Sequence, residues 1–221
     1  MTLTIEITSD FICPWCWVAE TRLQRALAQL APAVDVQWVW HPFELNPDMP
    51  AAGLDRRTYR TQKFGSWAYS LQLDAQTVQA TQQDGLAFRY DLMTTTPNTL
   101  QAHRLTGFAA QQGQATAMAE RLLRAYFAEG ANIAEVAVLV RLAGEVGFDQ
   151  DAVKTFLDSE AGIPAVRQQE QQAIAQGVHG VPNIRIGTQV LSGAQPLAVF
   201  VTALQAAVQD LTLQASMGGQ S

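Results

Sequence analysis

The hydrophobic pattern changes its period twice within the first 45 residues. Near the N-terminus, apolar residues occupy every second position, which predicts a half-buried strand ending near residue 9. From Pro14 the apolar residues lie three or four positions apart, which predicts a helix. Residues 34–45 alternate again and predict a second strand. Strand, helix and strand at this length predict a βαβ unit, with parallel strands joined by a right-handed crossover.

The middle of the chain has the spacing of helices. Residues 46–66 are polar and interrupted by proline and glycine, which indicates a boundary. Helical spacing then continues for more than a hundred residues. Residues 133–147 are apolar nearly all round, as expected at the centre of a helical cluster. Two shorter helices are predicted around 150–158 and 164–176.

The pattern returns to β-type after Gly177. The segments "NIRIG" and "VLSG" predict two strands separated by a turn, and apolar residues at core spacing after Pro196 predict a last helix. The final residues, "ASMGGQS", are expected to be disordered. Together these elements predict an α/β fold. One domain consists of residues 1–50 and 177–221, and an all-helical insertion, 51–176, interrupts it.

Composition narrows the class of protein. The chain of 221 residues is 48% hydrophobic, enough for a substantial core. Its net charge is −6 and no cluster of Lys or Arg stands out, so we expect no nucleic-acid partner. No run of eighteen apolar residues occurs, so we expect no transmembrane helix. The N-terminal segment lacks the features of a signal peptide, which favours a cytoplasmic protein whose thiols stay reduced.

Cys13 and Cys16 are the only cysteines, and both belong to the segment "CPWC" at the start of the predicted helix. Pro14 suits the first helical position, where no N–H is needed. Residues three apart in a regular helix have Cβ atoms about 5–6 Å apart, whereas a disulfide needs about 3.5–4.5 Å. Cys13 must therefore leave the helical register to form a bond with Cys16. Such a small ring gains little from loop closure, so the pair suits a disulfide that opens and closes.

The helix N-terminus also favours one thiol over the other. Its free N–H groups and dipole stabilise an anionic sulfur on Cys13, which we expect to be accessible. Cys16, one turn further in, is expected to be more buried and to resolve a mixed disulfide. A zinc site is not predicted, because the chain has no third cysteine and its histidines are not in ligand spacing.

Five segments in order resemble the FrnE-like branch of the DsbA family of thiol-disulfide oxidoreductases: "SDFICPWCW", "HPFELNPDMP", "NTLQAHRL", "HGVPNIRIG" and "SGAQP". The resemblance implies a thioredoxin fold interrupted by a helical insertion. It also implies a cytosolic oxidoreductase or isomerase with Cys13 as nucleophile and Cys16 as resolving thiol. Val181–Pro182 is then a cis peptide beside the disulfide, able to pair with a substrate strand. From the residues alone, Pro182 could equally be a strand-entry proline.

Three further residues near the cysteines are candidates for supporting roles. Glu20 shares a helix face with Cys16 and is a candidate proton relay, the alternative being a solvated carboxylate. Trp15 carries no charge, unlike the His of periplasmic DsbA relatives, so we expect a less acidic Cys13 and a less oxidising couple. Phe11 and Trp15 are candidates for an apolar rim around the site, whereas Trp17 is expected in the core.

Substrate-binding candidates are Phe11, His41, Asn98 and His103. Asn98 has an alternative interpretation as a helix N-cap and His103 as an ordinary satisfied histidine. His41 ends the second predicted strand and could line the same cleft.

The resemblance implies thiol- or disulfide-containing proteins, or small thiols, as partners, and no cofactor beyond the redox-active disulfide, with glutathione as a candidate cosubstrate. An alternative is a glutathione-dependent transferase or isomerase of the kappa-class or hydroxychromene carboxylate isomerase type. Those relatives typically carry serine at the position of Cys13. A third alternative is a noncatalytic binding or chaperone module. The physiological substrate, the direction of electron flow and the oligomeric state stay open.

Overall fold

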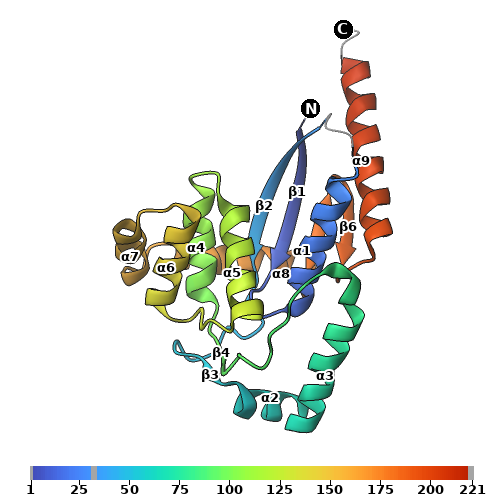
Figure 1. Ribbon diagram of the computed structural model, residues 1–221. Coiled ribbons are helices and arrows are strands. Elements are labelled where there is room, and N and C mark those ends of the chain that lie inside the picture. Colours follow the sequence, from blue (N-terminus) through green and yellow to red (C-terminus); the bar gives the residue numbers. More distant parts are fainter. Residues whose placement is uncertain (1, 31–33, 219–221) are drawn as a thin grey trace.

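A four-stranded sheet lies at the centre of the structure, a computed structural model that describes residues 2–30 and 34–218 (Figure 1). Its strand order is β2-β1-β5-β6. The strands are β1 (Thr2–Ser9), β2 (Asp35–Pro42), β5 (Asn183–Ile186) and β6 (Gln189–Ser192). The N-terminal and C-terminal parts of the chain therefore form one sheet, although more than a hundred residues separate them.

The sheet is mixed. β1 and β2 are parallel along their whole length, from Thr2 opposite Asp35 to Ser9 opposite Pro42. β1 is antiparallel to β5, and β5 to β6. The central strand β1 buries its apolar residues and β2 occupies one edge. The predicted βαβ unit is confirmed.

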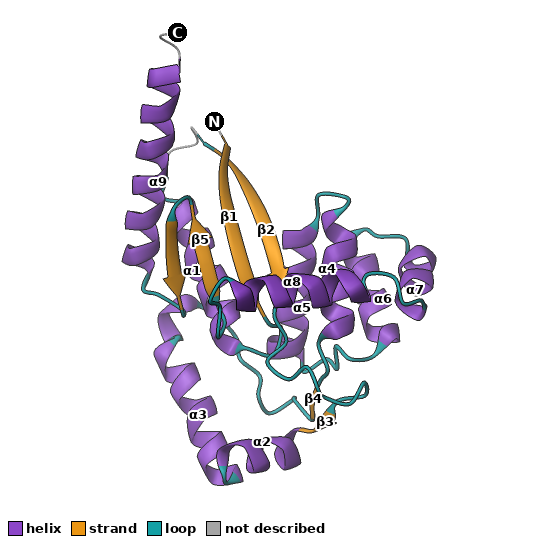
Figure 2. Ribbon diagram, turned by 180° about the vertical axis from the view of Figure 1, so that it is seen from behind, coloured by secondary structure: helices purple, strands orange, loops and turns teal. Residues whose placement is uncertain are grey.

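Helices cover both faces of this sheet. α1 (Pro14–Leu27) and α9 (Leu197–Gly218) pack against each other on one face. Their apolar stripes share a core with β1 and β5 that includes Leu23, Phe200 and Leu204. α8 (Ile163–Ala175) crosses the opposite face, as the views from the front and from behind show (Figures 1 and 2).

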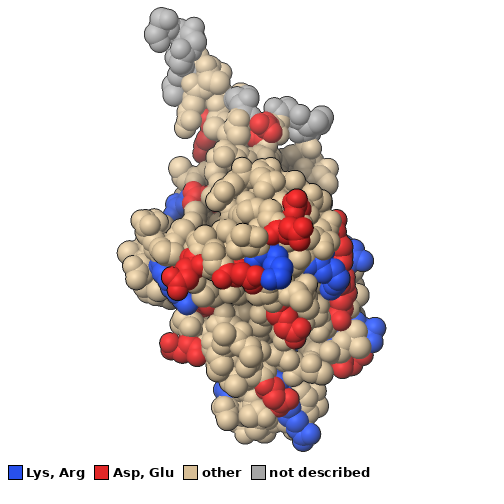
Figure 3. Space-filling view, turned by 90° about the vertical axis from the view of Figure 1, so that its left-hand side faces the viewer, with Lys and Arg blue, Asp and Glu red and all other residues tan. Residues whose placement is uncertain are grey.

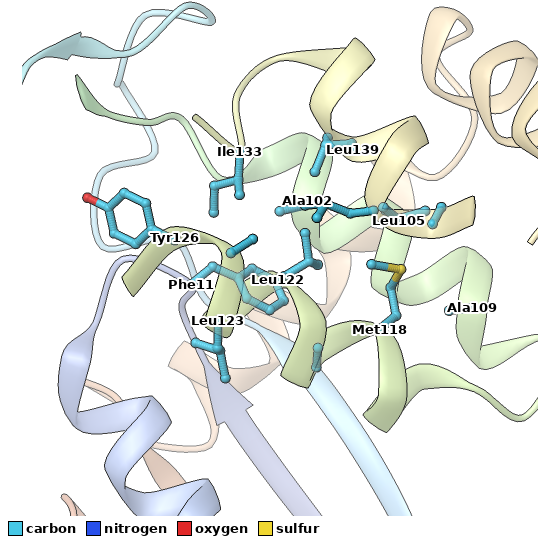
Figure 4. Close-up of a cluster of buried hydrophobic side chains, with 14 of the residues drawn as sticks. Phe11, Ala102, Leu105, Ala109, Met118, Leu122, Leu123, Tyr126, Ile133 and Leu139 are labelled. Atoms are coloured by element: carbon cyan, nitrogen blue, oxygen red, sulfur yellow. The ribbon is translucent and has the colours of Figure 1, made fainter. Parts of the chain in front are cut away.

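A second core lies between the inserted helices α4 (Leu100–Ala110), α5 (Ala115–Glu129), α6 (Val136–Val146) and α7 (Gln150–Asp158). Phe11, in the loop between β1 and α1, inserts its ring among Ala102, Leu122 and Leu123 (Figure 4). Because Phe11 belongs to the loop that leads to Cys13, the packing of the helical part helps to position that loop. The expected fold class, a thioredoxin-like fold with a helical insertion, is confirmed. The domain boundaries near residues 50 and 177 stay a prediction.

The segment 46–66 contains an unpredicted helix. α2 (Arg56–Phe64) begins at Asp55, whose side chain accepts a hydrogen bond from the Thr58 N–H, and α3 (Trp67–Ala80) follows it. Arg56 and Arg60 each donate to Asp74 of α3, at 2.7 and 2.8 Å. Charged pairs rather than an apolar stripe thus join α2 to α3, so hydrophobic periodicity could not reveal α2.

Short elements connect these helices to the α4–α7 core. β3 (Leu54–Asp55) and β4 (Thr95–Thr96) form a two-residue antiparallel ladder, and η1 (Gln82–Asp84) is a single 3₁₀ turn.

The prediction of a disordered tail is wrong for residues 215–218, which continue α9; residues 219–221 lie outside the described part of the chain. The Ser216 hydroxyl donates to the Thr212 carbonyl at 2.9 Å, a bond compatible with helix. Length and composition would also allow Leu197–Ser216 to cross a membrane, with a mean hydropathy of 1.2. Phe200, Ala203 and Leu204, however, pack in the core of the sheet.

Candidate active site

Cys13 caps the N-terminus of α1. Its backbone is extended, with φ −90° and ψ 111°, and Pro14 is the first helical residue. The Cys13 N–H donates to the Asp10 carbonyl at 3.1 Å, and the Cys16 N–H donates to the Cys13 carbonyl at 3.0 Å. Cys13 therefore lies outside the helical register, as its chemistry with Cys16 requires. Both cysteines are free thiols.

The loop before β5 approaches Cys13 from the opposite end of the sequence. The Val181–Pro182 peptide bond is cis, and the Cys13 thiol donates to the Val181 carbonyl at 3.6 Å. This approach follows from the sheet, because β5 pairs with β1 and Asn183 lies opposite Thr8. The two strand ends thus bring together residues 168 positions apart in the sequence.

The two thiols have opposite pKa shifts. The pKa of Cys13 is lowered, mainly because the Cys16 side chain hydrogen-bonds to its sulfur, and the Cys16 and Trp15 N–H groups act in the same direction. Burial and the Asp10 carboxylate oppose this effect. The pKa of Cys16 is raised well above its usual value, first of all by burial. Cys13 is therefore the thiol that ionises first.

The prediction of an exposed Cys13 is wrong. Its exposed fraction is only 6%, against 2% for Cys16. The local sequence could not indicate this burial, because a distant residue, Val181, contributes the carbonyl that contacts the sulfur. Little of Cys13 meets solvent, so a substrate must approach it along the remaining open side.

Glu20 lies one turn after Cys16 and is only 4% exposed, so the interpretation as a solvated carboxylate is wrong. Burial, followed by repulsion from Glu120 of α5, raises the pKa of Glu20 to about 8. Thr21 donates to one carboxyl oxygen at 3.4 Å, while the other has no partner among the described residues. Glu20 is therefore a buried carboxyl group whose acid and carboxylate forms are both present near neutral pH.

The aromatic residues around the cysteines lie at different depths. Trp15 is 38% exposed. Trp17 is confirmed in the core and stacks on Phe127 with ring centroids 5.8 Å apart. Phe11 is also buried, with its ring 4.9 Å from that of His103. Phe11 is thus a core residue and contributes no exposed rim, which leaves Trp15 as the aromatic side chain at the surface of the motif.

The polar substrate-binding candidates have structural partners. Asn98 is buried; its amide donates to the Met49 carbonyl at 2.8 Å, and its oxygen accepts from the Leu100 N–H at 2.9 Å, at the start of α4. His103 Nε2 lies 3.5 Å from Asp10 Oδ1. His41 lies 3.0 Å from Glu6 near the surface. Contacts of these residues with a substrate stay predictions.

The sequence reasoning missed a set of buried charges beside this loop. Asp10 is fully buried and accepts from the Leu45 N–H at 2.7 Å. Burial and Glu170 raise the pKa of Glu44 to about 7, although Arg167 pairs with both carboxylates. The available signal was an acidic residue next to each of two apolar segments, in "SDFICPWC" and "HPFEL".

The sheet order, the cysteine at the start of α1 and the cis-proline loop define a DsbA-like thioredoxin fold. Residues 4–205 match the family model described as "DSBA-like thioredoxin domain". The chain belongs to this family, whose members are generally thiol-disulfide oxidoreductases.

Three solved structures illustrate the similarity. A probable DsbA oxidoreductase, SCO1869 from Streptomyces coelicolor, is 31% identical with a TM-score of 0.84, covering 94% of this chain and 90% of its own. A 2-hydroxychromene-2-carboxylate isomerase is 19% identical with a TM-score of 0.69, covering 96% and 98%. The cytosolic disulfide reductase DsbM from Pseudomonas aeruginosa, also solved with GSH, is 22% identical with a TM-score of 0.63, covering 97% and 100%. At these identities the last two show the fold alone.

Proposed function

We propose that this protein is a cytosolic thiol-disulfide oxidoreductase or isomerase that uses Cys13 as nucleophile and Cys16 as resolving thiol. The observation that carries the proposal is the opposite pKa shift of two thiols at one helix N-terminus. Membership of the DSBA-like family supports it. The motifs "HPFELNPDMP" and "HGVPNIRIG" support an assignment to the FrnE-like branch of that family.

The reaction proceeds in two exchanges. The Cys13 thiolate attacks one sulfur of a substrate disulfide, a mixed disulfide forms, and the second substrate sulfur leaves as a thiolate that takes up a proton. Cys16 then loses its proton and attacks the Cys13 sulfur, which releases the first substrate sulfur as a thiolate. Two electrons have passed to the substrate and Cys13–Cys16 is oxidised. The reverse sequence delivers a disulfide.

Glu20 is the proposed proton acceptor for Cys16. Cys16 is buried and its pKa is high, so it needs a nearby base before it can attack. Glu20 is on the same helix face one turn away. With a pKa of about 8, it can both accept and return a proton near neutral pH.

Val181 is the proposed contact for the substrate backbone. Its carbonyl already lies against the Cys13 sulfur, so a substrate strand that pairs with this loop places its cysteine beside the nucleophile.

The proposed partners are proteins or small thiols that carry a disulfide or a free thiol, with glutathione as a candidate cosubstrate. The structure of DsbM with GSH supports glutathione. A nucleic-acid partner is not proposed. Acidic and basic side chains are interspersed over the face shown in Figure 3, without a large patch of one sign.

A glutathione-dependent isomerase or transferase is the second candidate, because the fold also matches a 2-hydroxychromene-2-carboxylate isomerase. The intact Cys13–Cys16 pair favours the oxidoreductase. Isomerase or conjugating activity that survives replacement of both cysteines by serine would favour this second candidate instead.

Trapping of mixed disulfides tests the proposal. Cys16→Ser should accumulate covalent adducts with substrate that dithiothreitol releases, whereas Cys13→Ser should form none. Adducts that persist without Cys13 would contradict the assigned roles. The reduction potential of the wild-type couple against glutathione then gives the direction: a value below the cytosolic poise indicates a reductase and one above it an oxidant or isomerase.

A further inference from the structure

The outer edge of the sheet, along β2, has no strand paired with it, and α4, α5 and α8 lie near that strand. The inner edge of this strand pairs with β1 from residue 35 to residue 42. No other strand pairs with its outer edge, and no backbone hydrogen bond from the rest of the described chain reaches residues 36–41 there. Unpaired N–H and C=O groups in such a row form a template for another extended chain.

A cavity of about 720 Å³ runs along this edge. One wall consists of the consecutive residues 37–42, and the opposite walls are α4 and α8. Successive side chains of a strand point to opposite faces of the sheet. Consecutive residues therefore border one cavity only if it follows the strand edge rather than either face. The volume is within the range of ligand-binding sites.

On the α4 side, a glycine leaves the cavity free of a side chain. Gly107 lies in the middle of the helix, where glycine is unfavourable compared with alanine. A Cβ atom at this position would meet no atom within 4 Å, so packing does not require the glycine. Ala110 and Ala165 also line the cavity with small side chains.

The inner end of the cavity is polar and lies at the catalytic end of the sheet. Ser9 and His103 both line the cavity; Ser9 Oγ is buried without a hydrogen-bond partner among the described residues, and His103 Nε2 lies 3.5 Å from Asp10 Oδ1. Ser9 lies opposite Pro42 in the β1–β2 register, four residues before Cys13.

The walls carry little free charge. The lining contains no Asp or Glu. Its one arginine, Arg104, donates to backbone carbonyls, including those of Phe156 at 2.8 Å and Ser159 at 2.7 Å. An uncharged, partly apolar occupant therefore fits this cavity better than a charged one.

We propose that this groove binds an extended, uncharged stretch of an unfolded polypeptide, which adds to the sheet as a strand beside β2. The strand edge is the reason for a polypeptide, because its donors and acceptors repeat along the strand with a spacing that only another extended backbone matches. The inference deepens the proposed function and rests on it in one respect: it names unfolded proteins as the substrate class of the nearby dithiol.

Binding of a cysteine-blocked probe tests the groove apart from the redox chemistry. The probe is a fluorescently labelled polypeptide kept unfolded by carbamidomethylation of all its cysteines, and the protein carries Cys13→Ser and Cys16→Ser. In this background Gly107→Trp, which fills the groove, should weaken binding at least tenfold by fluorescence anisotropy. Gly107→Ala, which adds only a Cβ, should stay within twofold. Ala110→Trp is the second filling variant, in case Gly107→Trp does not fold.

Amide hydrogen exchange tests the mode of binding. Among residues 37–41, the probe should slow exchange of the amides that point away from β1 at least tenfold in the Gly107→Ala protein, and should leave them unchanged in the filled variants. If the folded filled variants bind the probe as tightly as Gly107→Ala, the groove is not the binding site. Weaker binding without protection of these amides would overturn strand addition.

The disulfide-reducing activity of the protein with both cysteines intact, measured on a small disulfide, provides a separate readout. Absence of this activity would contradict the proposed function but not the proposal that the groove binds a polypeptide.

Discussion

His103 Nε2 lies 3.5 Å from Asp10 Oδ1, and both side chains are buried. The pair joins α4 of the helical insertion to the loop between β1 and α1. The same aspartate also fixes the start of the active-site turn, because its carbonyl accepts the Cys13 N–H at 3.1 Å. Asp10 therefore acts on Cys13 through its backbone and through the charge of its carboxylate.

Replacing Asp10 by asparagine should lower the pKa of Cys13. The carboxylate raises that pKa by repulsion of the thiolate, and asparagine keeps an oxygen that can accept the Leu45 N–H while removing the charge. The thiolate absorbance of Cys13, followed against pH in the Cys16→Ser background, measures the shift. Asp48→Asn, at an exposed position, is the control and should leave the titration unchanged. A pKa that rises in Asp10→Asn would show that the carboxylate favours the thiolate.

Stability should fall as pH rises between about 4.5 and 8, because of Glu20. Its folded pKa is raised from 4.5 to about 8, so the folded state keeps a proton that the unfolded chain releases. The stabilising contribution is complete below about 4.5 and is lost as pH approaches 8. The loss is a few kcal/mol, since each unit of pKa difference corresponds to about 1.4 kcal/mol.

Urea unfolding of wild type and Glu20→Gln at several pH values measures this contribution. The variant should show a flatter dependence across the window, whereas Glu160→Gln, at an exposed position, should follow wild type. Parallel curves for wild type and Glu20→Gln would contradict a raised pKa at Glu20.

The sequence predicted the parts of the fold that depend on local pattern. Alternation in β1 and helical spacing after Pro14 led to the βαβ unit, and the position of Cys13 before a helix led to its place outside the helical register. These features depend on residues close together in the chain. The opposite character of the two thiols also follows from their places on one helix.

The features that the sequence did not predict depend on distant partners. The burial of Cys13 depends on Val181, and the burial of Glu20 depends on its position against α5. α2 escaped prediction because its arginines pair with Asp74 instead of presenting an apolar stripe. In each case a residue far away in the sequence determines the environment of the side chain. The local hydrophobic pattern contains no information about that residue.

Replacing Trp15 by histidine should lower the pKa of Cys13 and make the couple more oxidising. Trp15 is the exposed residue between the cysteines and has no charge, whereas a protonated imidazole there stabilises the thiolate and hence the reduced form. Equilibration with glutathione should give Trp15→His a reduction potential tens of millivolts higher than that of wild type. Differences of this size separate known thiol-disulfide oxidoreductases from one another. Trp15→Phe keeps an uncharged ring and should stay near wild type. Equal potentials in the His and Phe variants would exclude charge at this position as the determinant.

Two glycines with the same backbone conformation should respond differently to alanine. Gly130 and Gly113 have φ of +67° and +71°, so alanine is strained at both by about 1 kcal/mol. At Gly113 a Cβ would meet nothing within 4 Å, whereas at Gly130 it would lie 2.6 Å from the Leu92 carbonyl oxygen. Gly130 ends α5 and packs on the segment before β4, so the backbone there must move to relieve the contact.

We therefore expect Gly130→Ala to destabilise the protein by about 3 kcal/mol and Gly113→Ala by about 1 kcal/mol, measured by urea unfolding. The difference between the two variants isolates the steric contact from the backbone strain. Similar losses in both would place Leu92 further from Gly130 than the structure does.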